Sequence, residues 1–167
     1  MQGKKLKLTK VQCVTGIEKS FENALALIED AKLLLKKGSF GHSVALSMLA
    51  IEECGKAMFL VSVYDEETEL DKQTFHMMFR NHVSKLYLPL LELALSKNFP
   101  KVDVEYIKTL APTLNLVKQR GLYVNFLEGK WVTPQDSDLE NIANVNLNYT
   151  ERVINGLSEV VKNIQKS

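Results

Sequence analysis

Several common signatures are missing from this sequence, and each absence narrows the class of protein. Its 167 residues include two cysteines, Cys13 and Cys54, which lie far apart and form no Cys-x-x-Cys motif. We therefore expect two reduced thiols in a cytoplasmic protein rather than a secreted disulfide scaffold. No run of about 20 uncharged apolar residues is present, and no apolar core follows the basic residues 1–10, so neither a membrane helix nor a signal peptide is expected. The net charge of +1 provides no overall attraction to nucleic acid or membranes, so any basic patch must be local.

What is present is a globular composition with helical patterning. Apolar residues make up 46% of the chain and charged residues 25%, and the length suits one domain with a real core. We expect a basic N-terminal tail over residues 1–10 and a single helical domain over residues 11–167. Apolar residues recur at three- and four-residue steps, which predicts five helices, at about residues 11–37, 41–64, 71–96, 103–120 and 137–166.

Local signals add detail to these helices. Gly38 is the expected C-cap of the first helix, and Pro89 is expected to kink the third. Ser137, with Glu140 three residues later, predicts a capping box for the last helix. Residues 122–126 are expected to be extended or irregular, and no β-hairpin is predicted. The expected fold is therefore all-α, an up-and-down bundle of about five helices.

The segment from residue 45 to residue 60 combines an apolar helix with charges. It is apolar nearly all the way round, so we expect it to be buried, yet it carries Glu52, Glu53 and Lys56. At about 100° per residue these three side chains share one sector, with Lys56 between the two acids and close enough to contact both. Buried charges are costly unless they are paired, so the segment predicts an ion-paired group with either a structural or a catalytic role.

A second candidate lies on the predicted third helix. Phe79 and His82 fall within about 40° of Phe75 around the helix, so His82 is expected to face the core with Lys85 beside it, whereas Arg80 points away. A lone histidine on an apolar face is more often a hydrogen-bonded core residue than a catalyst. The nearby acidic and basic groups could instead orient the imidazole and shift its pKa, which leaves the catalytic interpretation open.

The end of the predicted fourth helix supplies a third candidate. Arg120 and Tyr123 could present a guanidinium fork and a phenol to a phosphate. Basic residues in a last turn are also what any helix prefers, and Tyr123 could simply pack a loop onto the bundle. His42, His76 and His82 show no metal-ligand spacing, so no metal or other cofactor is expected.

Three short sequence segments occur in a defined order along the chain. They are Ile-Glu-Glu-Cys-Gly-Lys-Ala at 51–57, Phe-Arg-Asn-His-Val-Ser-Lys at 79–85 and Lys-Gln-Arg-Gly-Leu-Tyr-Val at 118–124. In this order, and over most of the chain from about residue 11 to residue 131, the sequence resembles the AbiV family of abortive-infection proteins. The resemblance implies a HEPN-like helical bundle, commonly dimeric, and a role in defence against phage. Many HEPN-type proteins are metal-independent endoribonucleases that carry an Arg-x4-6-His motif at a dimer interface.

The chain departs from that motif. The only histidine after Arg80 is His82, two residues later, and residues 68–79 contain no arginine. Cleavage of RNA would therefore need other groups, with His82 as general acid or base and lysine or arginine side chains stabilising the phosphorane. The products would be a 2′,3′-cyclic phosphate and a 5′-hydroxyl. The candidate catalytic residues are His82, Lys85, Glu53 and Lys56, and the candidate substrate-binding residues are Glu52, Arg120 and Tyr123.

Two functions remain open at this point. In the first, the protein acts in phage defence on RNA or the translation machinery through the Glu/Lys/His group. In the second, it is a non-catalytic binding module that recognises a phage-encoded or host protein, and the charged group is a structural network. The missing arginine–histidine motif favours the second, whereas the number of ionisable residues directed inward favours the first, because a structural network is replaceable by apolar residues. A homodimer is expected in both cases, and a membrane partner in neither.

Overall fold

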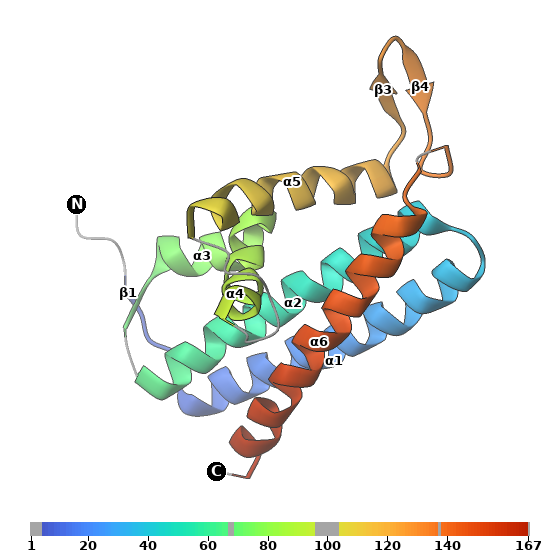
Figure 1. The fold of residues 1–167 in the computed structure, drawn as a ribbon. Coiled ribbons are helices and arrows are strands. Elements are labelled where there is room, and N and C mark those ends of the chain that lie inside the picture. Colours follow the sequence, from blue (N-terminus) through green and yellow to red (C-terminus); the bar gives the residue numbers. More distant parts are fainter. Residues whose placement is uncertain (1–4, 67–68, 96–103, 137, 167) are drawn as a thin grey trace.

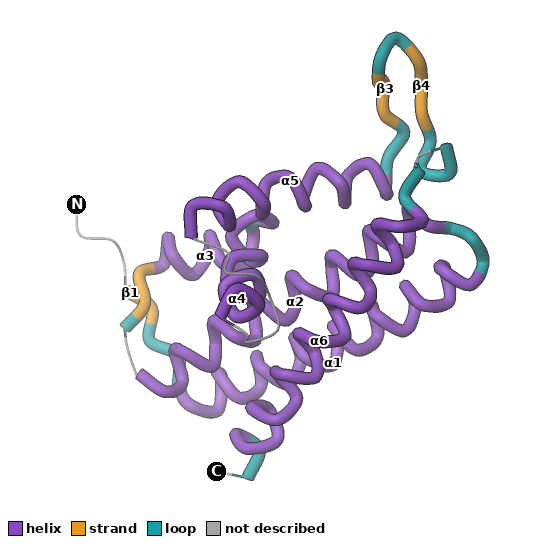
Figure 2. Tube along the Cα trace, viewed as in Figure 1, coloured by secondary structure: helices purple, strands orange, loops and turns teal. Residues whose placement is uncertain are grey.

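The computed structural model describes residues 5–66, 69–95, 104–136 and 138–166. Over these residues the protein is an all-helical bundle with two short antiparallel sheets (Figures 1 and 2). The helices are α1 (Lys10–Lys36), α2 (Phe40–Glu66), α3 (Lys72–Arg80), α4 (His82–Leu95), α5 (Val104–Leu122) and α6 (Glu140–Ile164). The strands are β1 (Lys5–Leu6), β2 (Leu70–Asp71), β3 (Asn125–Leu127) and β4 (Lys130–Val132), paired as β1 with β2 and β3 with β4.

Helices α1 and α2 form a long antiparallel pair whose ends are set by local chemistry. Thr9 and Gln12 form a capping box at the start of α1. At its end Gly38 has a φ of 72°, a left-handed conformation that suits glycine, and the amides of Gly38 and Ser39 donate to carbonyls of the last turn. This cap reverses the chain within a few residues, so that α2 returns along α1 (Figure 1).

Helix α2 is the centre of the bundle and packs against α1, α4, α5 and α6. One apolar cluster joins it to α1 and α6, and a second joins it to α4, α5 and the start of α6. The prediction that residues 45–60 form a buried helix is therefore confirmed. In the described ranges, no helix has a stretch that is both long enough and apolar enough to cross a bilayer.

The predicted third helix is two helices, which raises the number of described helices from about five to six. The break is at Asn81, whose backbone is extended and whose Oδ1 accepts hydrogen bonds from the amides of Val83 and Ser84. Asn81 thus ends α3 and caps the N-terminus of α4. Pro89 lies inside α4 without interrupting it. The predicted last residue, Ser96, lies outside the described residues.

Residues 125–132 form a β-hairpin, so the expectation of no hairpin is wrong. Its turn uses two successive left-handed residues, Glu128 at φ 49° and Gly129 at φ 81°. This is the backbone of a two-residue hairpin turn, but Glu-Gly is a weaker signal for it than Asn-Gly or Asp-Gly. The hairpin projects beyond the helices at the end of α5 (Figure 1).

The ends of two other helices also differ from the predictions. Helix α5 runs through Pro112 and Gly121 to Leu122 rather than ending at Arg120. Helix α6 begins at Glu140, and the preceding Leu139 makes no side-chain cap. The predicted capping residue, Ser137, lies outside the described residues.

Gly55 allows α2 and α4 to approach closely, which generates a first prediction. A Cβ at Gly55 would lie 1.9 Å from the carbonyl oxygen of Lys85. Because that oxygen belongs to the backbone of α4, it cannot shift without a large cost in folding free energy. We expect Gly55→Ala to destabilise the protein by about 1–3 kcal/mol, toward the upper end, in urea unfolding. Gly16→Ala is the matched control, because its Cβ would meet only the flexible end of Leu60, at 2.6 Å. Equal stability of the two variants would contradict the close approach.

Candidate functional site

A buried carboxylate, Glu52, gathers three nitrogen groups from other helices. The residue is 2% exposed and lies in the middle of α2. Lys118 Nζ donates to Glu52 Oε1 at 2.5 Å, and Lys85 Nζ and His82 Nδ1 approach Oε2 at 2.8 and 2.7 Å. We refer to Glu52, His82, Lys85 and Lys118 as the Glu52 cluster. It ties α2 to α4 and α5 through a single side chain.

The local sequence explains why these groups meet. The Asn81 cap makes His82 the first residue of α4, and Lys85, three residues later, lies on the same side of that helix. Gly55 lets this part of α4 lie directly against α2, one turn from Glu52. Lys118 follows Ala111 and Leu114 along the inward side of α5, so its ammonium reaches Glu52 Oε1, the oxygen that His82 and Lys85 do not contact.

The cluster is electrostatically favourable for an ionised carboxylate. Burial alone would raise the pKa of Glu52, but hydrogen bonds from Lys118, Lys85 and His82 together outweigh burial and hold that pKa below its ordinary value. Lys85 and Lys118 are also buried. With both lysines charged, one carboxylate faces two ammonium groups, so the cluster has an excess of positive charge even when the imidazole is neutral. That excess favours an anionic ligand at its open side.

His82 provides the open side. Its side chain is 52% exposed, in contrast to the other three members. Glu52 can only accept hydrogen bonds, so Nδ1 carries the proton and the neutral ring keeps Nε2 as an unprotonated acceptor. Lys85 Nζ lies 3.4 Å from the same Nδ1 because both groups donate to Glu52 Oε2, and not because they bond to each other. A carboxylate that orients an imidazole in this way prepares Nε2 for proton transfer.

The predicted Glu-Glu-Lys group divides in the structure. Lys56 Nζ pairs with Glu53 Oε1 at 2.6 Å, three residues back on its own helix, and both side chains are partly buried. Glu52 instead contacts α4 and α5, so among the described residues Lys56 pairs with Glu53 alone rather than contacting both acids as predicted. Of the candidates taken from the sequence, the structure brings together Glu52, His82 and Lys85.

Arg120 and Tyr123 lie elsewhere, and one member of the cluster was missed. Both of those side chains are exposed, and no contact joins them to Glu52 among the described residues. Lys118 was not identified from the sequence, because a basic residue near a helix end is usually a solvated cap. Its spacing from Ala111 and Leu114, which places it on the apolar side of α5, was the signal that could have found it.

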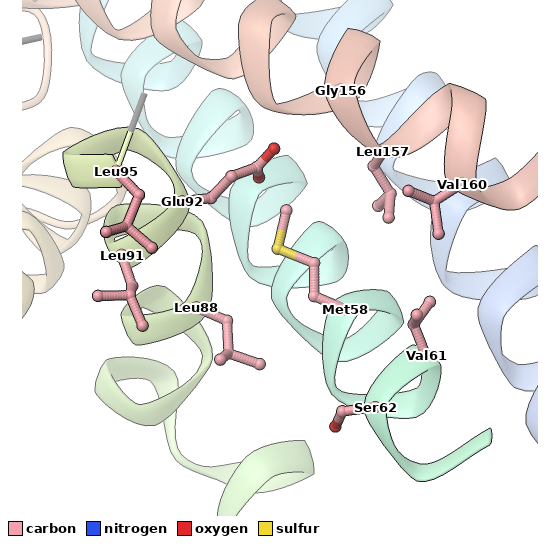
Figure 3. Close-up of a pocket in the computed structure, with 10 residues that line it drawn as sticks. All are labelled: Met58, Val61, Ser62, Leu88, Leu91, Glu92, Leu95, Gly156, Leu157 and Val160. Atoms are coloured by element: carbon pink, nitrogen blue, oxygen red, sulfur yellow. The ribbon is translucent and has the colours of Figure 1, made fainter. Parts of the chain in front are cut away.

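A groove of about 350 Å³ between α2, α4 and α6 is separate from the cluster (Figure 3). Its lining is mostly aliphatic, with Glu92 supplying a carboxylate whose pKa is raised by burial. None of the predicted site residues lines it. Because one acid among aliphatic side chains offers little for catalysis, the groove is a less suitable site than the Glu52 cluster. The lining residues are Met58, Val61, Ser62, Leu88, Leu91, Glu92, Leu95, Gly156, Leu157 and Val160.

The two thiols are also unsuited to chemistry. Cys13 and Cys54 are free and buried, as expected for reduced cysteines. Burial raises the pKa of Cys54 to about 12, so its thiol stays protonated near neutral pH and is not a nucleophile.

The fold and the site together define an all-helical bundle with an exposed histidine held by a buried carboxylate and two lysines. A family model described as AbiV, of HEPN type, matches residues 12–155, a span that contains all four members of the Glu52 cluster. The chain belongs to this AbiV family of HEPN-like abortive-infection proteins, which confirms the resemblance found in its sequence. No significant match is found among curated proteins or solved structures.

Removal of the Glu52 carboxylate is expected to be strongly destabilising. The variant Glu52→Gln leaves two buried ammonium groups without their anion, which we expect to cost about 3–5 kcal/mol in urea unfolding. Glu53→Gln, on the next residue of the same helix, should cost less because its pair with Lys56 is closer to solvent. Exchanging Lys85 and Lys118 for methionine in the Glu52→Leu background should restore much of the loss. A Glu52→Gln variant as stable as wild type would exclude the buried ionic cluster.

The depressed pKa of Glu52 also predicts an acid dependence. The folded protein binds a proton at Glu52 more weakly than the unfolded chain does, so the carboxylate's contribution is complete above the unfolded pKa of about 4.3. That contribution is lost as the pH falls through the lower folded pKa. We expect the stability difference between wild type and Glu52→Gln to shrink in this acidic range. Urea unfolding of both proteins at a series of pH values measures it, and a difference independent of pH would show that Glu52 is not ionised.

Proposed function

We propose that this abortive-infection protein acts on RNA, with His82 as the proton-transferring residue of the Glu52 cluster. The observation that carries the proposal is the 2.7 Å contact of Glu52 Oε2 with His82 Nδ1 on a half-exposed imidazole. This arrangement leaves Nε2 able to take a proton from the ribose 2′-hydroxyl. Buried Lys85 and Lys118 supply positive charge behind the ring, where low dielectric strengthens their effect on a phosphate.

The proposed reaction is an internal transesterification in which the 2′-oxygen displaces the 5′-oxygen from phosphorus. The 2′-oxygen loses its proton to His82 Nε2 and attacks the adjacent phosphorus, and the bond from phosphorus to the 5′-oxygen breaks. The departing oxygen takes a proton from water, and the hydroxide formed removes the proton from His82 Nε2. The products are a 2′,3′-cyclic phosphate and a 5′-hydroxyl, and the histidine returns to its starting state. Lys56, Glu53, Arg120 and Tyr123 remain predicted contributors, with the two exposed residues best suited to contact RNA outside the cluster.

A non-catalytic binding module is the second candidate. It is favoured by the burial of Glu52, Lys85 and Lys118, since three buried and paired charges are what a structural ion network would contain. In this function the cluster fixes the positions of α2, α4 and α5, and another surface recognises a phage-encoded or host protein. A cytoplasmic homodimer is proposed for both functions.

Cleavage of RNA by wild type and by His82→Ala distinguishes the two functions. Incubation of purified protein with total RNA should give discrete new ends bearing 2′,3′-cyclic phosphates, and His82→Ala should reduce the rate by about 10²–10⁴-fold. His76→Ala is the matched control, because His76 is an exposed histidine on the neighbouring helix α3. His76→Ala should keep wild-type activity. Cleavage that persists in His82→Ala, or wild-type protein that protects cells from phage without cutting RNA, would overturn the ribonuclease proposal.

A further inference from the structure

The β3–β4 hairpin packs little against the helical bundle. It projects from the end of α5, and its strands pair with each other while making little contact with the helices (Figure 1). A two-stranded ribbon of three residues per strand is marginal on its own in water. Because little contact with the helices covers the hairpin, its faces are available for binding.

The hairpin carries aromatic rings that are exposed to solvent. Phe126 and Trp131 are directly opposite each other across the two strands, so their side chains share one face, with ring centroids 5.1 Å apart. Trp131 is 74% exposed and Phe126 59% exposed. Tyr123 and Val124, just before β3, are also exposed. The cross-strand contact supports the ribbon while leaving most of both rings accessible to a ligand.

Positive charge accompanies these rings. Residues 118–132 contain Lys118, Arg120 and Lys130 against one acid, Glu128, and both Arg120 and Lys130 are exposed. Arg120 lies in the last turn of α5, two residues after the lysine that contacts Glu52. Arg120 and Lys130 therefore provide exposed positive charge next to the hairpin, whereas Lys118, on the same helix as Arg120, is buried against Glu52.

The size and chemistry of the hairpin favour nucleic acid over protein. A stable protein interface involves about 20–30 residues on each side, whereas this hairpin offers six strand residues and a two-residue turn. Exposed aromatic rings beside cations are the usual means of holding single-stranded nucleic acid, since bases stack on the rings and phosphates meet the charges.

We propose that the β3–β4 hairpin binds single-stranded RNA, with Trp131 and Phe126 stacking on unpaired bases and Arg120 and Lys130 contacting phosphates. The proposal rests on RNA being the substrate of the proposed function, and it assigns to the hairpin the positioning of that substrate. In this arrangement α5 carries a binding element at its end and a member of the Glu52 cluster one turn earlier.

Trp131 itself reports the interaction, because it is the chain's one tryptophan. Titration of the full-length protein with a 12-nucleotide oligouridylate should quench its fluorescence. In fluorescence anisotropy with labelled oligouridylate, Trp131→Leu should bind about 5- to 100-fold more weakly, as expected for loss of one stacked base. Trp131→Phe should retain most of the affinity. Tyr106→Leu is the control, because it removes an exposed aromatic ring in the first turn of α5, and it should bind like wild type. The combined Arg120→Gln and Lys130→Gln variant should show a weaker dependence of binding on salt.

Binding and cleavage are measured separately, so this proposal and the proposed function can fail independently. Loss of oligouridylate binding in Trp131→Leu, with wild-type binding in Tyr106→Leu, supports the hairpin even if RNA is still cleaved by His82→Ala. Wild-type affinity in Trp131→Leu would overturn the hairpin proposal even if RNA is cleaved. If Trp131→Leu leaves RNA binding unchanged and instead lowers the mass measured by sedimentation, the hairpin is a protein contact and the RNA proposal is overturned.

Discussion

The pairing of the Glu52 carboxylate with nitrogen groups from α4 and α5 is the interaction on which the centre of the molecule depends. Apolar packing between α2 and its neighbours is non-directional and would tolerate a range of helix positions. The contacts between three donors and the two oxygens of one carboxylate do not tolerate such a range, because each donor must reach a defined side of the carboxylate. The desolvation of three charged residues is offset only when α4 and α5 are both in place, so the ionic cluster specifies an arrangement that the core alone leaves loose.

The same carboxylate connects stability to chemistry. Three members of the cluster are buried, and they hold the fourth, His82, where its ring is half exposed. A network kept only for stability has no need of a solvent-reachable histidine at its edge, since an apolar replacement of the whole group is often neutral or better. The cost of burying the charges is understandable if they maintain the tautomer and the direction of one imidazole. Glu52 thereby links the fold to the proposed reaction without requiring a separate active-site cleft.

The sequence predicted the helices well because apolar periodicity is local, and it predicted the site only in part because partners come from distant segments. Glu52, Lys56 and Glu53 do share a sector of α2, but the ion pairs were decided by which helices lie against that sector, and Lys118 reaches Glu52 from 66 residues away. The break at Asn81 depended on a side-chain cap that competes with helix continuation, and Asn in a long amphipathic pattern is a weak signal. The Phe126–Trp131 ribbon was hidden because its turn is Glu-Gly.

The break at Asn81 between α3 and α4 also changes the meaning of the missing Arg-x4-6-His motif. In the motif, arginine and histidine lie one turn or more apart on a continuous helix, so that both can face one phosphate. Here Arg80 ends α3 and His82 begins α4, with extended Asn81 between them, so the two-residue spacing is not a shortened version of the same geometry. Positive charge beside the histidine comes instead from Lys85, one turn further along α4, and from Lys118 on α5. In the proposed ribonuclease function, a histidine and two lysines assembled on one carboxylate take the place of the arginine–histidine pair on one helix. In the proposed reaction the two buried lysines act from the Glu52 carboxylate, and direct contact with RNA phosphates is assigned to exposed residues such as Arg120.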